Sequence, residues 1–470
     1  MAKSYYKGFI PYAAAALMVG VVGGFAAVLP PALVQDLGLA YNNTTWSTLA
    51  LAMSSAACAP ILGRLGDVLG RKVTLLLGIA VFAIGNALTA LSSTLIPVLI
   101  SRFIVGIGTA AIAPVILSYI VTEFPPEEMA RGFSLYMLIS SSAVIFSPTI
   151  GGFIIESASW QAMVWLCAAI ALGVFIFCFF FRENAPRPRG TLAGFDGFGA
   201  LAILIFFSLA LCLPAFGQNF GWSSRAFLLT LAASVAAFAG LLLAESRAKN
   251  PILQKSFLAR RAFILPVLAL FLTQGLMQAN MTNTIVFVNY TQPENTIISS
   301  YAISIMYFGM SLGSVFAAPL ADRYEPRNVL TITLAATGAG CALMLAFTPD
   351  ASALLLALSL GVLGLGLGGN ATIFLKVVLT GLDARSAGAG TGTYGLFRDL
   401  SAPFGVAVLV PLFTNSITAR VQSTAISDAL AAVEAIRMLA VVELFCVGLG
   451  IILVRLLPRV HAAELGKQGG

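Results

Sequence analysis

Five charged side chains lie inside long apolar stretches of the sequence, where a charge is energetically unfavourable. They are Arg102, Lys376, Arg398, Asp399 and Glu443, whereas almost every other charged residue lies in a short gap between such stretches. Placing Arg, Lys or Asp at the centre of a bilayer costs roughly 2.5–3.5 kcal/mol, so intramembrane charges are functional candidates. Three of the five are basic and two are acidic, which favours a negatively charged ligand.

Each of these charges has a functional and a structural interpretation. Arg102 and Arg398 carry donor forks that suit a carboxylate or sulfate, but an Arg also bonds backbone carbonyls or packs helices as an ion pair. Burial disfavours the charged form of a carboxylate, so Glu443 is a candidate proton carrier, with Asp399 as its rival and a permanently hydrogen-bonded Glu as the alternative. Arg398 and Asp399 point about 100° apart on a helix and are not expected to pair. Lys376 lies near the end of its stretch, where snorkelling to the interface also explains it.

One apolar stretch, residues 273–290, is unusually polar for a helix that faces lipid. We predict that its amides line a substrate cavity, with three tyrosines from later segments as neighbours; polar contacts between helices are the alternative. These candidate substrate-binding residues are Gln274, Gln278, Asn280, Asn283, Tyr301, Tyr307 and Tyr394.

The composition is that of a membrane protein. The chain has 470 residues, of which 59% are hydrophobic and 10% charged, against about 25% charged in soluble proteins. Its net charge of +7 is spread over many short loops, which excludes a nucleic-acid partner. The single His461 and six cysteines without a C-x-x-C pair argue against a metal site, a cofactor or an enzyme.

Apolar segments long enough to cross a bilayer, about 20 residues each, recur along the chain. We expect an all-α polytopic protein with fourteen transmembrane helices near 9–30, 46–62, 73–92, 95–119, 132–154, 160–181, 197–216, 226–244, 262–289, 298–320, 329–348, 352–376, 388–413 and 437–457. Basic residues concentrate in the loops on the side of the N-terminus, which predicts that both termini are cytoplasmic. We expect the protein to be a monomer in the inner, cytoplasmic membrane.

The polar linkers 181–190 and 245–261 separate two inserted helices from the rest. They predict three parts: a six-helix bundle at 1–185, the inserted pair at 186–255 and a second six-helix bundle at 256–470.

A loop pattern repeats in the two bundles. GRLGDVLGRKVTLL (63–76) and APLADRYEPRNVLTI (318–332) follow equivalent helices, and repeated halves are typical of secondary transporters that bind substrate between them. We expect conformational-switch roles for a small set of loop residues: Gly63, Asp67, Gly70, Arg71, Asp322 and Arg323.

These motifs resemble those of the major facilitator superfamily over nearly the whole chain. Residues 63–75 match its G-x-L-x-D-x-x-G-R-[RK] signature, SRFIVGIGTAA (101–111) its fourth-helix Arg signature, and SPTIGG (147–152) an antiporter motif with Pro148, Gly151 and Gly152. FDGFGA (195–200) and LFRDLSAPFG (396–405) are similar to the fourteen-helix drug:proton antiporter branch. The resemblance implies a major facilitator fold with two inserted helices, and a proton-coupling role for Arg102.

One departure weakens the expectation of a cation exporter. The first-helix Asp of that branch falls on Val21 and its Asn on Ala26. YKGFIPY (6–12), NNTTW (42–46) and IVTEFPPEE (120–128) are similar to the proton-dependent bile-acid transporters of gut clostridia.

We therefore predict a proton-coupled carrier that moves a small amphipathic organic anion by alternating access, with multidrug efflux by proton antiport as the alternative. The sequence contains neither the constellation of catalytic residues expected of a membrane enzyme nor the ring of charges expected of a channel. The G-x-G-x-x-G at Gly364, Gly366 and Gly369 lies in an apolar stretch without a preceding strand, so we interpret these glycines as helix-packing residues rather than a nucleotide site.

Overall fold

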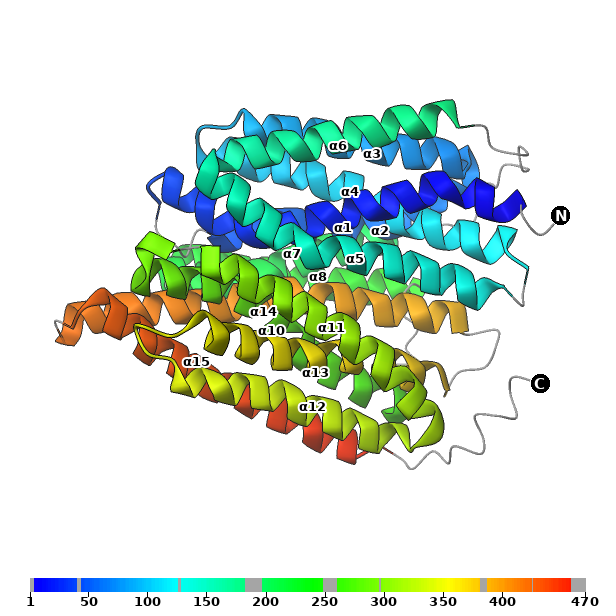
Figure 1. Cartoon of the computed structure of the whole chain (residues 1–470). Coiled ribbons are helices and arrows are strands. Elements are labelled where there is room, and N and C mark those ends of the chain that lie inside the picture. Colours follow the sequence, from blue (N-terminus) through cyan, green and yellow to red (C-terminus); the bar gives the residue numbers. More distant parts are fainter. Residues whose placement is uncertain are drawn as a thin grey trace. The chain divides into compact units, whose positions relative to one another are not determined.

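The chain folds into long α-helices, as its apolar stretches require. The computed structural model describes residues 4–39, 44–125, 128–181, 197–247, 260–295, 297–380, 387–424 and 426–457. A helix satisfies its own backbone hydrogen bonds, which a membrane interior cannot do. The helices, shown in Figure 1, are α1 Ser4–Asp36, α2 Thr44–Leu69, α3 Arg71–Ala90, α4 Leu95–Glu123, α5 Met129–Ser157, α6 Trp160–Phe180, α7 Gly197–Phe220, α8 Arg225–Arg247, α10 Arg261–Thr291, α11 Ile297–Arg323, α12 Pro326–Leu343, α13 Ala353–Thr380, α14 Ala387–Thr424 and α15 Asp428–Arg455. Short 3-10 turns occur at Pro293–Asn295 and Met344–Ala346.

Twelve of the helices are long and apolar enough, within the described residues, to cross a membrane. Helices α2 and α7 form but are not among these twelve, so the expected fourteen spans are not confirmed. The all-helical membrane fold is confirmed.

The chain divides into two compact units. The first comprises 1–213 and 228–251, and the second comprises 214–227 and 252–470. Helix α8 thus groups mainly with the first unit. The predicted boundary at 256 lies close to the division at 252, while the inserted pair as a separate part stays a prediction.

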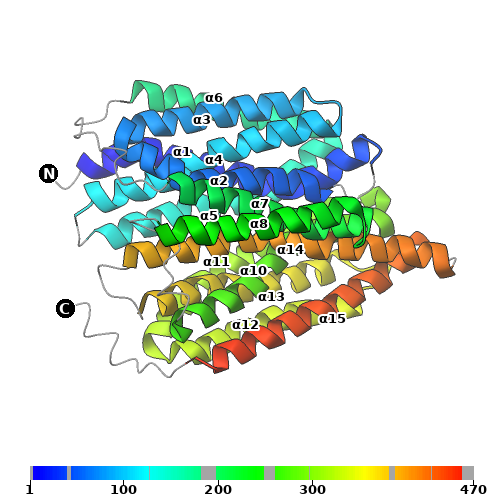
Figure 2. The ribbon, with the colours of Figure 1, turned by 180° about the vertical axis from the view of Figure 1, so that it is seen from behind.

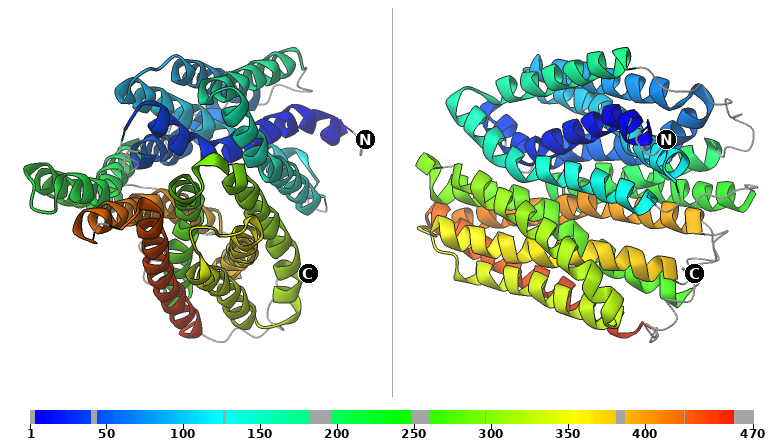
Figure 3. Two further views of the ribbon diagram at one scale, coloured as in Figure 1. Left: turned by 60° about the vertical axis from the view of Figure 1, so that its left-hand side comes forward. Right: turned by 45° about the vertical axis from the view of Figure 1, so that its right-hand side comes forward.

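Helices pair in the same way within each unit. In the first, α3 packs on α4 and α6, α2 on α4, and α1 on α5 and α6; Figure 2 shows α3, α4 and α6 side by side. In the second, α12 packs on α13 and α15, α11 on α13, and α10 on α14 and α15; the lime to red helices of Figure 3 are α11–α15. The repeated loops of the sequence therefore belong to repeated helix bundles.

The repeat extends to single residues. Buried positions from Thr74 to Asn86 on α3 recur with identical spacing from Val329 to Cys341 on α12. Lys72, which begins this part of α3, donates to the carbonyl oxygens of Phe179 (3.0 Å) and Phe181 (2.5 Å) at the end of α6.

Arg327 of α12 makes the equivalent bond to Leu457 O, 3.1 Å away at the end of α15. Both cations thus satisfy carbonyls that a helix end leaves without partners. Six of the seven buried positions of α6 recur with the same spacing on α15, where Trp160, Cys167 and Cys178 correspond to Ile436, Glu443 and Val454.

Glycines set how closely the central helices approach one another. A Cβ added to Gly106 of α4 would lie 2.0 Å from Ser54 Oγ of α2, and one on Gly364 of α13 would lie 2.1 Å from Met306 O of α11. A Cβ on Gly366 would meet Thr337 Oγ1 at 2.3 Å. The interpretation of the G-x-G-x-x-G sequence as a helix-packing stripe is confirmed.

Replacing Gly364 with Val is expected to destabilise the second unit, because the new side chain overlaps a backbone carbonyl of α11. Overpacking of this kind typically costs about 1–3 kcal/mol. The melting temperature of the purified protein in detergent should fall by several degrees. The control is Gly448→Val on α15, where nothing lies within 4 Å of an added Cβ; equal melting temperatures for the two variants would contradict the close contact.

Candidate functional site

Three helices of the second unit meet at the side chain of Glu443. This residue of α15 is fully buried, with 0% of its surface exposed. Its Oε1 accepts a hydrogen bond of 2.8 Å from Asn280 Nδ2 on α10. The thiol of Cys341 on α12 lies near the carboxyl group. The predicted proton carrier is therefore held by a buried polar cluster that consists of Glu443, Asn280 and Cys341.

The cluster is incompletely satisfied. Glu443 Oε2 and Asn280 Oδ1 are buried without a hydrogen-bond partner in the described part of the chain, and so are both polar side-chain atoms of Asn283, one turn further along α10. More than nine-tenths of buried polar groups in proteins are paired, so each exception calls for an explanation. An oxygen left free on a carboxyl group is a place where a proton can bind.

No cation neutralises Glu443 within the described residues. The ion pairs that occur there are Arg71–Glu123 (2.5 Å) and Arg420–Glu434 (2.6 Å), and neither includes it. A buried charge without a partner is strongly disfavoured. The site thus suits a carboxyl group that is neutral for part of a cycle and charged for the rest.

The first unit contains a buried charge of the opposite sign. Arg102 of α4 is 3% exposed, and its Nε has no hydrogen-bond partner in the described ranges. It interacts electrostatically with Cys167 of α6, the residue that corresponds to Glu443 in the repeat. Counting back from the paired glycines Gly106 and Gly364, the position equivalent to Arg102 is the fully buried Leu360. Each unit therefore carries its buried charge at a different position of the repeat.

The other candidate residues of α10 make helix-to-helix contacts. Gln274 is buried and donates to Leu367 O of α13 at 3.3 Å, whereas Gln278 is half-buried. The bond of Gln274 is of the kind that polar packing between helices predicts, as is the bond of Asn280.

The three tyrosines do not share one environment. Tyr394 is buried and donates to Ala371 O at 3.1 Å. Half-buried Tyr307 lies with its hydroxyl 3.5 Å from Met281 Sδ, and Tyr301 is exposed. The structure thus joins only Asn280 of the predicted cavity residues to Glu443. Cys341 was not among the predicted site residues, and its place opposite Asn86 in the repeat emerges from the burial pattern of the structure.

Two of the five intramembrane charges lie elsewhere. The Arg398 side chain is exposed on α14, and its backbone carbonyl accepts a bond of 2.8 Å from Ser401 Oγ. The Asp399 side chain lies outside the described residues, so its rivalry with Glu443 stays a prediction. Half-buried Lys376 of α13 donates to Ala321 O at 2.8 Å, in the last turn of α11. This contact caps a helix end, and snorkelling of Lys376 to the interface stays a prediction.

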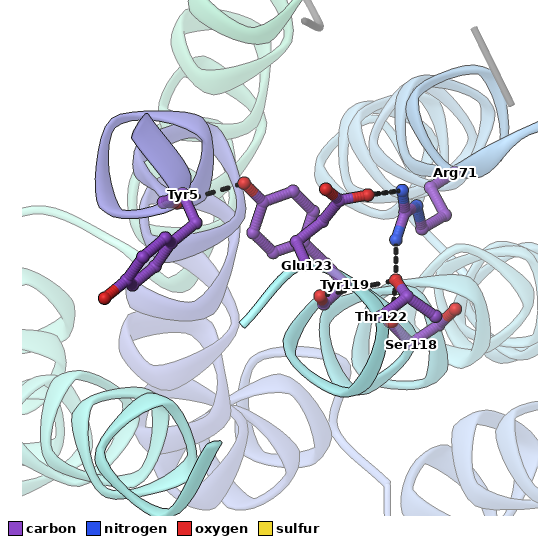
Figure 4. A network of polar contacts seen from close by, with 6 residues as sticks. All are labelled: Tyr5, Arg71, Ser118, Tyr119, Thr122 and Glu123. Atoms are coloured by element: carbon purple, nitrogen blue, oxygen red, sulfur yellow. Dashed lines mark hydrogen bonds and ion pairs between the residues drawn. The ribbon is translucent and has the colours of Figure 1, made fainter. Parts of the chain in front are cut away.

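Arg71 holds the repeated loop of the first unit against the end of α4. Gly70 before it adopts a φ of +92°, a conformation that glycine adopts readily and other residues rarely do. The Arg71 guanidinium bonds Thr122 and the Glu123 carboxylate (2.5 Å) and lies over the Tyr119 ring, whose hydroxyl donates to Tyr5 O (Figure 4).

The remaining predicted switch residues lie within helices rather than loops. Gly63 and Asp67 belong to α2, and Asp322 belongs to the last turn of α11. The side chains of Asp67 and Asp322 lie outside the described part of the chain. Arg323 is exposed at the end of α11.

The predicted antiporter motif lies where α1 and α5 touch. A Cβ on Gly151 would lie 2.9 Å from the Phe25 ring, and one on Gly24 would lie 2.3 Å from Ser147 Cβ and 3.0 Å from Pro148. Gly152 is half-buried beside them. The small residues of the motif thus permit close packing of these two helices.

Comparison with known proteins gives consistent matches over most of the chain. The family model described as "Major Facilitator Superfamily" matches residues 12–406. Multidrug resistance protein 3 of Bacillus subtilis (strain 168) is 24% identical over 82% of this chain and 75% of its own length. The Tetracenomycin C resistance and export protein of Streptomyces glaucescens is 24% identical over 85% of this chain and 74% of its own.

Solved structures share the fold. A crystal structure of an auto-inhibited POT family peptide transporter superposes with a TM-score of 0.69 at 15% identity, covering 97% of this chain and 98% of that one. The nucleoside transporter NupG gives a TM-score of 0.65 at 14% identity, covering 94% and 99%.

Lys376→Met is expected to lower the melting temperature by a few degrees, because the last carbonyls of α11 lose a cap worth about 0.3–1 kcal/mol. Transport by the folded protein should change by less than about twofold, because this contact caps the end of α11. Melting curves in detergent and initial transport rates in proteoliposomes measure the two effects. A large loss of transport without any loss of stability would assign Lys376 to the transport site instead.

Proposed function

The chain belongs to the Major Facilitator Superfamily and is a multi-pass membrane transporter; from this premise we propose that it exports amphipathic organic molecules in exchange for protons. Glu443 would carry the proton. We further propose that both termini lie in the cytoplasm and that the protein resides in the cytoplasmic membrane, as the distribution of basic loops predicts.

One observation carries the proposal: a fully buried carboxyl group with one bonded and one free oxygen, and no ion-pair partner within the described residues. Protonation at the free Oε2 would remove the cost of a buried charge. Release of that proton would be favoured when the alternating halves open the site to the less acidic side. Such a group links a conformational change to the proton gradient without any cofactor.

Relatives of the chain and the packing of α1 on α5 support the substrate class. Relatives that match over most of this chain are named as multidrug or antibiotic resistance transporters. The close packing of α1 and α5 at Gly151 supports the resemblance to antiporters. Drug export therefore replaces the organic-anion carrier of the sequence analysis as the leading proposal.

Glu443→Gln should abolish transport driven by a pH gradient, because the amide cannot release a proton at any working pH. The measurement is efflux of a fluorescent amphipathic drug in inside-out vesicles energised by an imposed gradient, where a drop of at least about tenfold is expected for loss of an essential acid–base group. Substrate counterflow without a gradient serves as the control and should persist. Normal gradient-driven efflux by this variant would transfer the proton role to Asp399.

A second candidate function, transport of an organic anion such as a bile acid, is favoured by Arg102. This guanidinium is buried in the first unit and forms no ion pair within the described residues, so a substrate carboxylate or sulfate could supply the missing charge.

Arg102→Gln is expected to reduce cholate transport by about tenfold or more, since a charge-assisted bidentate contact contributes about 1.5–3 kcal/mol. Arg102→Lys should retain part of the activity because it keeps the charge. Uptake of labelled cholate and of a lipophilic cation is compared in the same proteoliposomes. If cation transport falls as much as cholate transport, Arg102 serves the fold or the coupling step and the anion candidate fails.

A further inference from the structure

Asn280 and Cys341 surround Glu443 from two different helices, and we propose that they are positioning residues that set the pH at which this carboxyl group takes up and releases its proton. The inference rests on the proposed role of Glu443 and adds two residues that no sequence motif of the chain singles out as a pair. It also explains why the carboxyl group is bonded on one oxygen only.

The Asn280 amide is fixed as a donor toward Glu443. Its Nδ2 donates both to Glu443 Oε1 at 2.8 Å and to Leu276 O, one turn back on α10, at 3.0 Å. Turning the amide over would lose the bond to Leu276, which can only accept. The orientation that follows from this network presents an N–H group, which stabilises the charged carboxylate.

Cys341 brings a thiol toward Glu443 from α12. Its thiol is fully buried on α12 and lies near the Glu443 carboxyl group, where it is able to donate a hydrogen bond. A thiol is a weak donor, so it favours the carboxylate less than the amide does. An amide donor on Oε1 and a thiol nearby, with Oε2 left free, permit both charge states within a single arrangement.

The repeat shows that this arrangement is special to the second unit. The equivalents of Glu443 and Cys341 in the first unit are Cys167 and Asn86. Asn86 Nδ2 donates to Phe82 O at 2.9 Å within its own helix, and the partner position on α6 is a thiol instead of a carboxyl group. The first unit therefore has a buried amide at the position of Cys341 and no carboxyl group at the position of Glu443.

Other titratable groups around Glu443 have separate partners or act only through space. In the described part of the chain, the Cys446 thiol on α15 itself interacts with it electrostatically, and α10 contributes the uncharged Asn280. On α14 and the outer end of α15, Arg420 pairs with Glu434, and Arg437 donates to Phe347 O at the 3-10 turn after α12. On α12, Arg327 is bonded to the end of α15.

The test is the pH dependence of gradient-driven drug efflux in inside-out vesicles, measured for a matched set of variants. Cys341→Ala and Asn280→Leu each remove a donor that stabilises the charged form, so the proton is held to higher pH. The midpoint of the pH profile should move upward by about one unit, the size expected for a lost hydrogen bond to a charged group. Cys341→Ser keeps a donor and should restore the original midpoint.

Cys446→Ala is the control. It removes a thiol that lies on α15, as Glu443 does, and that makes no hydrogen bond to Glu443. Its midpoint should stay within about 0.3 units of the unaltered protein, below the effect of one hydrogen bond. Substrate counterflow, which needs no net proton movement, verifies that every variant is folded and binds substrate. The Cys341 pair, which changes little volume, decides the matter if Asn280→Leu fails to assemble.

The two levels of the proposal fail in different ways. If Glu443→Gln uncouples efflux but the midpoint is unchanged in Cys341→Ala and Asn280→Leu, Glu443 remains the carrier and the positioning role is wrong. If Glu443→Gln pumps normally, the proposed carrier is wrong and the positioning role falls with it. An equal shift in Cys341→Ser and Cys341→Ala would also overturn the role of the thiol as a donor.

Discussion

Close approach of helix backbones is the constraint on which the rest of this structure depends. Lipid gives helices no hydrophobic reason to associate, so they must gain van der Waals contact and polar bonds instead. The glycines of α4 and α13 bring the neighbouring backbones so near that a single added carbon would overlap them. This tight packing gives the helices fixed rotational positions. A side chain such as Glu443 can then meet specific partners on α10 and α12.

The same constraint explains why so few polar groups are enough for function. Threonines and serines mostly bond carbonyls of their own helices, as Thr273 and Thr337 do. Helix ends are satisfied by cations at equivalent places of the repeat, Lys72 and Arg327. Among the described residues, Glu443 of the second unit and Arg102 of the first are buried charges at positions that the repeat does not equate. The two units thus share a pattern of helix packing and differ in their buried charges.

Much of the fold was predictable because each membrane helix is specified by its own stretch of sequence. A run of apolar residues at spanning length already excludes a soluble fold, and the repeated GRLGDVLGRK and APLADRYEPR loops predicted two related bundles. The count of spans was less accessible. Helices α2 and α7 form, yet neither is among the twelve spans found within the described residues. The candidate site was predictable only in part: Glu443 and Asn280 were each singled out, but nothing local joined them.

The sequence by itself determined which residues are anomalous, since a charge in an apolar stretch is costly wherever the helix packs. It also determined the family and the repeat, because motifs and spacing are properties of the chain. Only the tertiary structure decided what each anomaly does. Rotation and contact between helices brought Asn280 and Cys341 to Glu443, placed Lys376 on a helix end and left Arg398 exposed. These outcomes depend on which faces meet across the bundle, and periodicity within one helix does not specify the face of another.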